Sequence, residues 1–213
     1  MRRMDNTPTT IIMPTVKYAI VLVYLVISII STGCQTTPEI SIPKLLDDYG
    51  DFGGDFTLTD HHGQSFNLAD HRGDVFLIFF GFTYCPDACP TMLAKLQDVY
   101  KKLDIPKGHT VRTLYITVDP ERDTPEKLND YLSYFTTIDI LGLTGALDEI
   151  DAVAKQYSVI YNKVPLESAA GYLVDHATWL YLVDQDGELR YRFRHADPAQ
   201  EIVAGVKQLF QAP

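Results

Sequence analysis

Cys85 and Cys89, four positions apart, are the residues best suited to chemistry in this 213-residue chain. They follow the apolar run 75–80, which is short and rich in β-branched and aromatic residues, as is typical of a strand covered on both faces. Apolar residues then recur at helical spacing, which predicts a helix over 91–103. Pro90 suits a first helical turn and disfavours α geometry at the residue before it. We therefore expect both cysteines to flank the tight turn that leads into this helix.

A position beside a helix N-terminus favours reactive sulfur. Unpaired amides and the positive end of the helix dipole stabilise anions, so they lower the pKa of a nearby thiol. The thiolate is the form that attacks disulfides and binds metals. Two other interpretations remain: a buried pair that packs as small apolar residues, and a static disulfide that closes too short a loop to constrain the unfolded chain strongly.

The N-terminal segment is typical of a targeting sequence. Arg2, Arg3 and Lys17 precede the uncharged apolar stretch 18–30, which ends at Ser-Thr-Gly before Cys34. Small residues before a cysteine resemble a bacterial lipoprotein cleavage site, although a serine stands where such a site usually has leucine. This stretch of thirteen residues, apolar except for Ser28, is short for a membrane-spanning helix of about 20 and fits a signal-peptide core of about 7–15.

These features predict three regions. Residues 1–34 are a signal or lipoprotein segment with Cys34 as the lipidation site, or alternatively an uncleaved membrane anchor that extends back through Val16. Residues 35–54, which lack periodicity, are a linker, and residues 55–213 form the folded domain. Either form of tether places the domain on the outward-facing or periplasmic side of a bacterial cytoplasmic membrane. In that oxidising compartment, Cys85 and Cys89 form the one remaining even pair.

Composition limits the domain and its partners. With 46% hydrophobic residues, the chain can bury one good core. Its formal net charge is −10, and residues 35–213 alone carry 15 basic and 27 acidic residues, or −12. An acidic body argues against nucleic acid as a partner.

The pattern along the chain predicts an α/β fold. Strands alternate with helices and end in an antiparallel hairpin, which indicates a mixed central sheet flanked by helices, with an N-terminal β-hairpin extension at about 56–68. We expect further strands at 110–118, 140–143, 159–164, within 172–183 and at 188–194, and further helices at 125–135, 147–157 and 198–210.

Three separated motifs make the chain resemble the SCO/SenC family of copper-binding, thioredoxin-like cytochrome c oxidase assembly proteins. They are Gly-Phe-Thr-Tyr-Cys-Pro-Asp-Ala-Cys-Pro at 81–90, Val-Asp-Pro-Glu-Arg-Asp-Thr-Pro at 118–125, and Val-Asp-His at 174–176 before Tyr-Leu-Val-Asp at 181–184. The resemblance extends from about Asp55 to the C-terminus and implies a thioredoxin-like fold.

The resemblance also implies that Cys85, Cys89 and His176 bind one copper ion per chain, as Cu(I) or Cu(II). The donor set agrees with this, because thiolates suit Cu(I), imidazole suits either oxidation state, and three donors leave a position open for handing the metal on. Asp175 is a candidate to orient the imidazole, and Asp119 a candidate to tune the site or a partner interface. A cap or turn formed with Pro120 is an equal alternative for Asp119.

The function implied by this resemblance is a membrane-tethered copper metallochaperone. It would deliver copper to the copper-bearing subunit of cytochrome c oxidase, at its binuclear copper centre, and meet other copper chaperones or thiol reductants. The alternative is an enzyme, a thiol–disulfide oxidoreductase that uses the redox-active pair Cys85 and Cys89 to reduce the cysteines of that copper site. A peroxidase is a weaker third hypothesis, because the approach to the cysteines lacks the usual Pro/Thr-rich pattern.

Overall fold

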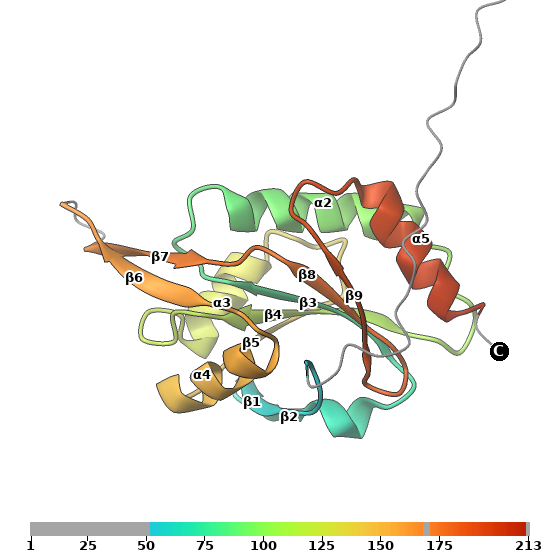
Figure 1. Cartoon of the computed structure of the whole chain (residues 1–213), viewed down its shortest axis with the longest axis horizontal. Coiled ribbons are helices and arrows are strands. Elements are labelled where there is room, and N and C mark those ends of the chain that lie inside the picture. Colours follow the sequence, from blue (N-terminus) through green and yellow to red (C-terminus); the bar gives the residue numbers. More distant parts are fainter. Residues whose placement is uncertain (1–51, 168–170, 212–213) are drawn as a thin grey trace, which may run out of the picture. The chain divides into compact units, whose positions relative to one another are not determined.

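The computed structural model describes residues 52–167 and 171–211 (Figure 1). The expected anchor segment, Cys34 and nearly all of the expected linker lie outside these residues. No helix within the described ranges is long and apolar enough to cross a membrane. The elements, in chain order, are β1 (Thr57–Asp60), β2 (Ser65–Asn67), the 3-10 helix η1 (Leu68–His71), β3 (Val75–Gly81), α2 (Ala88–Lys102), β4 (Val111–Thr117), α3 (Pro125–Leu132), β5 (Ile140–Thr144), α4 (Leu147–Gln156), β6 (Tyr161–Pro165), β7 (Tyr172–His176), β8 (Leu180–Val183), β9 (Leu189–Phe193) and α5 (Ala199–Leu209).

A mixed sheet forms the centre of the domain. Among the described residues its seven strands run in the order β2-β1-β5-β4-β3-β8-β9. The three inner strands β3, β4 and β5 are parallel, whereas β8, β9, β1 and β2 add antiparallel pairs at the two sides. The predicted N-terminal hairpin is confirmed as β1–β2, and it extends the sheet because β1 pairs with β5.

Helices cover both faces of this sheet, as expected. Tyr131 of α3 contacts Tyr115 of β4, which lies on the same face as its partner Phe79 of β3. Helix α2 covers the same face and packs against α5 (Figure 1). On the other face, Tyr157 at the end of α4 packs edge-on against Tyr181 of β8.

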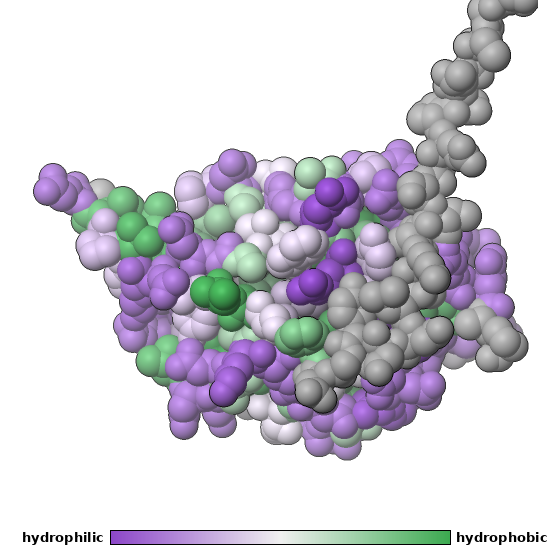
Figure 2. All heavy atoms as spheres, in the orientation of Figure 1, coloured by the Kyte–Doolittle hydropathy of each residue, from purple (hydrophilic) through white to green (hydrophobic). Residues whose placement is uncertain are grey.

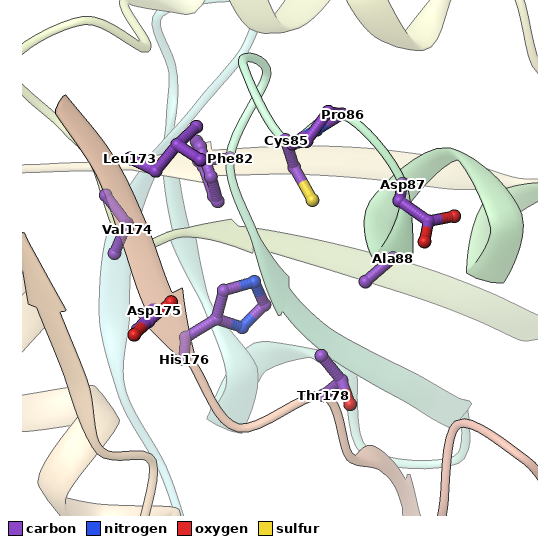
Figure 3. A pocket seen from close by; sticks show the side chains of 10 residues that line it. All are labelled: Phe82, Cys85, Pro86, Asp87, Ala88, Leu173, Val174, Asp175, His176 and Thr178. Atoms are coloured by element: carbon purple, nitrogen blue, oxygen red, sulfur yellow. The ribbon is translucent and has the colours of Figure 1, made fainter. Parts of the chain in front are cut away.

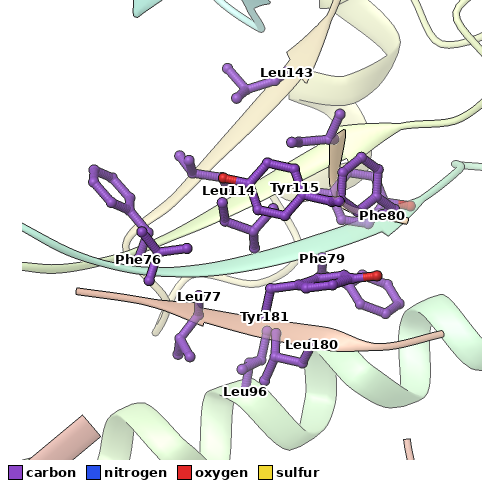
Figure 4. Close-up of a cluster of buried hydrophobic side chains, with 14 of the residues drawn as sticks. Phe76, Leu77, Phe79, Phe80, Leu96, Leu114, Tyr115, Leu143, Leu180 and Tyr181 are labelled. Atoms are coloured by element: carbon purple, nitrogen blue, oxygen red, sulfur yellow. The ribbon is translucent and has the colours of Figure 1, made fainter. Parts of the chain in front are cut away.

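The core lies between these layers. Every residue of β3 is buried, which explains its continuous apolar run, because a central parallel strand has no solvated face. Figure 4 shows Leu77 and Phe79 of β3 among side chains from β4, β8 and α2. This rigid strand ends at Gly81, directly before the Cys85 segment, and so fixes where that segment starts.

Helix α2 begins three residues earlier than the sequence predicts. Its first residue is Ala88, so Cys89 lies inside the first helical turn and not in the turn before it. Pro90 is tolerated there because its missing N–H is one of those that have no acceptor within a helix. Proline disfavours α-helical backbone angles at the residue before it, but Cys89 is nevertheless helical.

Strands β6 and β7 form a separate two-stranded ribbon, an arrangement that the sequence pattern did not indicate. Tyr161 pairs with His176 at one end and Pro165 with Tyr172 at the other. The ribbon extends away from the large sheet (Figure 1), and it exposes the apolar side chains of Val164 and Leu166. Apolar side chains also show on the ribbon in the space-filling view (Figure 2). A lone pair of strands is marginally stable in water, so the position of this ribbon depends on contacts with the body of the domain.

Candidate metal centre

Three elements bring Cys85, Cys89 and His176 together. Cys85 lies in the segment that follows β3, Cys89 in the first turn of α2, and His176 at the end of β7. Their ligand atoms, two Sγ and one imidazole nitrogen, all lie within 4.8 Å of one another. They are the one group of three or more His, Cys, Asp or Glu side chains with such geometry among the described residues.

The separations suit a single ion. Two donors that are each about 2.0–2.3 Å from one ion can lie up to about 4.6 Å apart. The Sγ of Cys89 lies 3.9 Å from Nε2 of His176, inside that limit, and both cysteines are free thiols. All three ligand atoms lie within 4.8 Å of one another, close to the span of two donors on one ion, so the site fits a soft metal ion.

The imidazole of His176 is oriented by a backbone carbonyl. Its Nδ1 lies 3.0 Å from the carbonyl oxygen of Ala177. If Nδ1 carries the proton, the lone pair of Nε2 faces the sulfurs, which is the arrangement of a metal-ligating histidine. Phe79 and Phe82 contact the ring edge-on and restrict its rotation.

Asp175 does not supply that contact in the structure. It is exposed and lines a pocket of about 290 Å³ together with His176 and Cys85. Figure 3 shows the His176 ring and the Cys85 sulfur in this pocket. The carbonyl of Ala177 takes the place that we expected for Asp175 at Nδ1, so the influence of Asp175 on the imidazole stays a prediction.

The two thiols have different environments. Cys85 is half-buried at the N-terminus of α2, and its Sγ accepts a hydrogen bond from the backbone N–H of Cys89 at 3.4 Å. A hydrogen bond from the Cys89 thiol, together with hydrogen bonds from the backbone amides of Asp87 and Cys89, lowers the pKa of Cys85 to about 4. The hydrogen bond to Cys85 and complete burial raise the pKa of Cys89. The pair therefore shares one proton, which stays on Cys89.

Asp119 anchors the ribbon that carries His176. Its carboxylate is buried and accepts hydrogen bonds from the Tyr172 hydroxyl of β7 at 2.8 Å and from Nε of Arg122. The amides of Arg122 and Asp123 both donate to its backbone carbonyl, so the turn expected after β4 is also present. Any effect of Asp119 on the metal site would act through β7.

Asp123 and Arg122, in the motif at 118–125, have roles that the sequence analysis did not predict. The carboxylate of Asp123 accepts hydrogen bonds from the backbone and hydroxyl of Thr83 and from the hydroxyl of Thr117, so it ties the segment before Cys85 to the end of β4. Arg122 lies over the rings of Tyr84 and Tyr172, at 4.7 and 3.7 Å from their centroids. The charged residues of the motif at 118–125 indicated that this segment has a role, but the sequence alone could not show which side chains they contact.

Fold and site together define the class of this protein as an α/β domain of thioredoxin type with a Cys₂His soft-metal site at the end of its central strand. Comparison with known proteins then identifies the family. The family model described as SCO1/SenC matches residues 46–211, and the chain belongs to this family. The resemblance proposed from three motifs is thus confirmed.

Individual relatives and solved structures support the same family assignment. The chain is 39% identical over 155 residues to "Protein SCO1 homolog, mitochondrial" from Homo sapiens, a match that covers 72% of this chain and 51% of the human protein. The crystal structure of Arabidopsis thaliana ScoI with copper bound superposes with a TM-score of 0.69 at 33% identity, over 75% of this chain and 98% of that one. BsSco, a member of the Sco family of cytochrome c oxidase assembly proteins with a disulfide switch, gives a TM-score of 0.61 at 27% identity, over 79% of this chain and 99% of that one. The expected thioredoxin-like α/β fold is therefore confirmed.

Proposed function

We propose that the chain is a copper metallochaperone that binds one copper ion, as Cu(I) or Cu(II), through Cys85, Cys89 and His176. The observation that carries this proposal is the convergence of two thiols and one imidazole within 4.8 Å, beside a pocket that Cys85 and His176 line. Two soft sulfurs and a borderline nitrogen are the donors that copper prefers. Copper bound to the related Arabidopsis thaliana protein supports the choice of metal.

Transfer would proceed by ligand exchange with the copper-bearing subunit of cytochrome c oxidase. Three protein donors leave a coordination position that faces the pocket, so an incoming thiolate of the partner can bind copper before Cys85 and Cys89 leave. Cys85 is more accessible than Cys89 and is the ligand that we expect to leave last. The description of BsSco as an assembly protein of this oxidase supports the choice of partner. Other copper chaperones or thiol reductants would reload the site with copper or keep it reduced.

Anaerobic titration of the reduced full chain with Cu(I), in competition with a chelator, tests the metal site. We expect one copper per chain for the wild type and a loss of tight binding in Cys85→Ser, Cys89→Ser and His176→Ala alike. His109→Ala is the matched control, because His109 lies before β4, at the end of the sheet away from the cysteines, and packs on Phe210. Unchanged binding in His176→Ala would contradict the three-ligand site.

A second candidate function, thiol–disulfide exchange, is favoured by the difference between the two thiols. The Cys85 thiolate would attack a disulfide of the apo copper site, forming a mixed disulfide and releasing one partner thiolate. Cys89, once deprotonated, would attack the Cys85 sulfur and release the second partner thiolate. The partner ends as a dithiol, and the chain ends with a Cys85–Cys89 disulfide that a thiol reductant must reduce.

His176→Ala separates the two functions. Ligand exchange needs the imidazole as a copper ligand, whereas thiol–disulfide exchange needs the two sulfurs. The variant and the wild type are mixed with the copper-bearing domain of the oxidase subunit, first as copper donors to the reduced domain and then as reductants of the oxidised domain. Loss of transfer with retained reduction assigns the chaperone role to the three-ligand site.

Attachment to a bacterial cytoplasmic membrane, facing outward, completes this proposal. It rests on the basic residues, apolar stretch and Cys34 of the first 34 residues. Lipidation of Cys34 and an uncleaved anchor are the two forms that it can take.

A further inference from the structure

The hydroxyl of Tyr115 is a buried polar group that the proposed function does not use. Tyr115 lies in β4 with no exposed surface, and its hydroxyl, which has the Tyr131 hydroxyl and the Cys89 sulfur as polar neighbours, has no hydrogen-bond partner of standard geometry among the described residues. Buried hydroxyl groups nearly always have a partner, because losing water without a replacement is costly. The surroundings of this oxygen therefore indicate what it can bind.

Gly81 shows which atom the hydroxyl faces. A methyl group on Gly81 would lie 2.7 Å from Oη of Tyr115 and 2.9 Å from Sγ of Cys89, closer than side-chain carbons approach such atoms. The phenol oxygen and the thiol sulfur therefore converge on the small space above Gly81, at the end of β3. Only glycine leaves this space open, so the sequence permits the two polar atoms to meet there.

Cys89 needs a donor of this kind. Its side chain has no exposed surface, so a thiolate at this position has no water to stabilise it. The sulfur of Cys89 has the backbone N–H of Phe82 nearby and Nε2 of His176 at 3.9 Å, and that nitrogen is a metal ligand in the proposed site. The Phe82 amide is thus one donor to this sulfur, and the Tyr115 hydroxyl is placed to be a second. A phenol O–H can donate to a sulfur that has lost its own proton.

We propose that Tyr115 is a positioning residue whose hydroxyl donates a hydrogen bond to the Cys89 sulfur when that sulfur binds copper. This inference deepens the proposed function and rests on it. The bond holds the buried sulfur in one rotamer, and it draws electron density from the sulfur, which weakens the sulfur's donation to Cu(II). Gly81 is required because a side chain there would separate the two atoms.

Tyr115→Phe tests the inference, with Tyr181→Phe as the matched control. Tyr181 is an equally buried tyrosine whose hydroxyl also has no partner of standard geometry within the described residues, and it lies on the opposite face of the sheet. Loss of a group that orients a metal ligand typically lowers metal affinity by about 10–100-fold. We expect Tyr115→Phe in the full chain to bind Cu(I) about tenfold more weakly in chelator competition, and Tyr181→Phe to bind as the wild type does.

A spectroscopic readout distinguishes the hydrogen bond from a loss of packing. In the Cu(II)-loaded chain, removal of a donor to sulfur raises the energy of the sulfur electrons, so the sulfur-to-copper charge-transfer band should move to longer wavelength in Tyr115→Phe alone. Gly81→Ala should weaken Cu(I) binding as well, and the double variant should be no weaker than the worse single one. Thermal unfolding of each variant shows that it is folded.

The possible outcomes distinguish a failure of the proposed copper-binding function from a failure of the role assigned to Tyr115. Failure of the wild type to bind copper would overturn the proposed function itself. Copper binding by the wild type, with the same affinity and band position in Tyr115→Phe and Tyr181→Phe, would overturn the role of Tyr115 and leave the metal site intact. An effect of Gly81→Ala without any effect of Tyr115→Phe would also overturn it, because the glycine would then matter for space alone.

Discussion

Cys85 and Cys89 differ in ionisation and accessibility because their sulfurs lie in different environments. Cys85 is half-buried and receives the first free amides of α2, so its thiolate is stabilised and can meet a partner. Cys89 is fully buried in the first turn of the helix and keeps its proton while Cys85 is ionised. Binding of a copper ion reverses this, because a positive charge between the sulfurs favours both thiolates.

The low pKa of Cys85 predicts an unusual pH profile for alkylation. In the reduced, metal-free chain, a pKa of about 4 keeps Cys85 ionised throughout pH 5–8, so its rate of reaction with iodoacetamide should be nearly constant there. An ordinary thiol reacts about tenfold faster for each pH unit over the same range, because its thiolate fraction rises at that rate below its pKa. Mass spectrometry of peptides from timed reactions gives the rate for each cysteine.

Cys89→Ala is the matched variant for this measurement. It removes the hydrogen bond that contributes most to the low pKa of Cys85, so the alkylation rate should begin to rise with pH. A tenfold rise per pH unit in the wild type would contradict the assignment of Cys85 as the thiolate.

At the scale of elements, the site depends on docking the β6–β7 ribbon against the segment after β4. Arg122 is central to this docking: its NH1 group donates to the carbonyl of Tyr172, its Nε donates to Asp119, and its guanidinium contacts the rings of Tyr84 and Tyr172. Lys163 of β6 adds an ion pair with Glu121. The ribbon carries His176, so these contacts set the distance from the imidazole to the sulfurs.

Arg122→Ala should therefore weaken both the fold and the metal site. It leaves the buried carboxylate of Asp119 without its cation, a kind of change that costs about 3–5 kcal/mol. We expect a decrease of this order in the free energy of unfolding by urea, and weaker Cu(I) binding because His176 is no longer held. The alkylation rate of Cys85 should change much less, since β3 and α2 still position it.

Arg112→Ala provides the comparison. The ion pair of Arg112 with Asp139 lies at the surface, and such pairs contribute about 0–1 kcal/mol. The variant should lose little stability and no copper affinity. Equal copper affinity in Arg122→Ala and the wild type would show that the ribbon holds His176 without this contact.

These elements also show how far the sequence could predict the structure. Local patterns were sufficient to place the strands and helices: the buried run of β3, the helix that begins at residue 125 and the antiparallel hairpin near the C-terminus are all present. The β6–β7 ribbon was not predictable, because its two strands pair with each other and not with the large sheet. The periodicity of a strand does not show which other strand it pairs with.

The site was predictable to a similar extent. The three ligands were identified through motifs, and the structure brings them together. The contacts that hold them were not predictable, because Arg122 and Tyr172 are 50 residues apart in the chain and Tyr115 and Cys89 belong to different elements. Such pairs are set by tertiary packing, which a single sequence does not display.

At the scale of the whole molecule, the proposed N-terminal tether would determine how the domain meets its partner. The first 34 residues carry an apolar stretch with basic residues before it and Cys34 after it. A tether confines donor and acceptor to one membrane surface, which raises their effective concentration without any new contact. The acidic charge of the domain also disfavours close adsorption to anionic headgroups, so the domain should remain free to turn its pocket toward a partner.

Cys34→Ala distinguishes the two forms of tether. If Cys34 is lipidated, the wild-type chain expressed in a bacterium should incorporate radiolabelled palmitate and lose its first 33 residues, and the variant should do neither. If the apolar stretch is an uncleaved anchor, both proteins should stay at full length in the membrane fraction without label. Cys85→Ala is the control for labelling, because it removes a thiol from the folded domain and leaves the targeting segment unchanged. Recovery of the wild-type chain in the fraction that is free of membranes, at full length and without lipid, would contradict both forms of attachment.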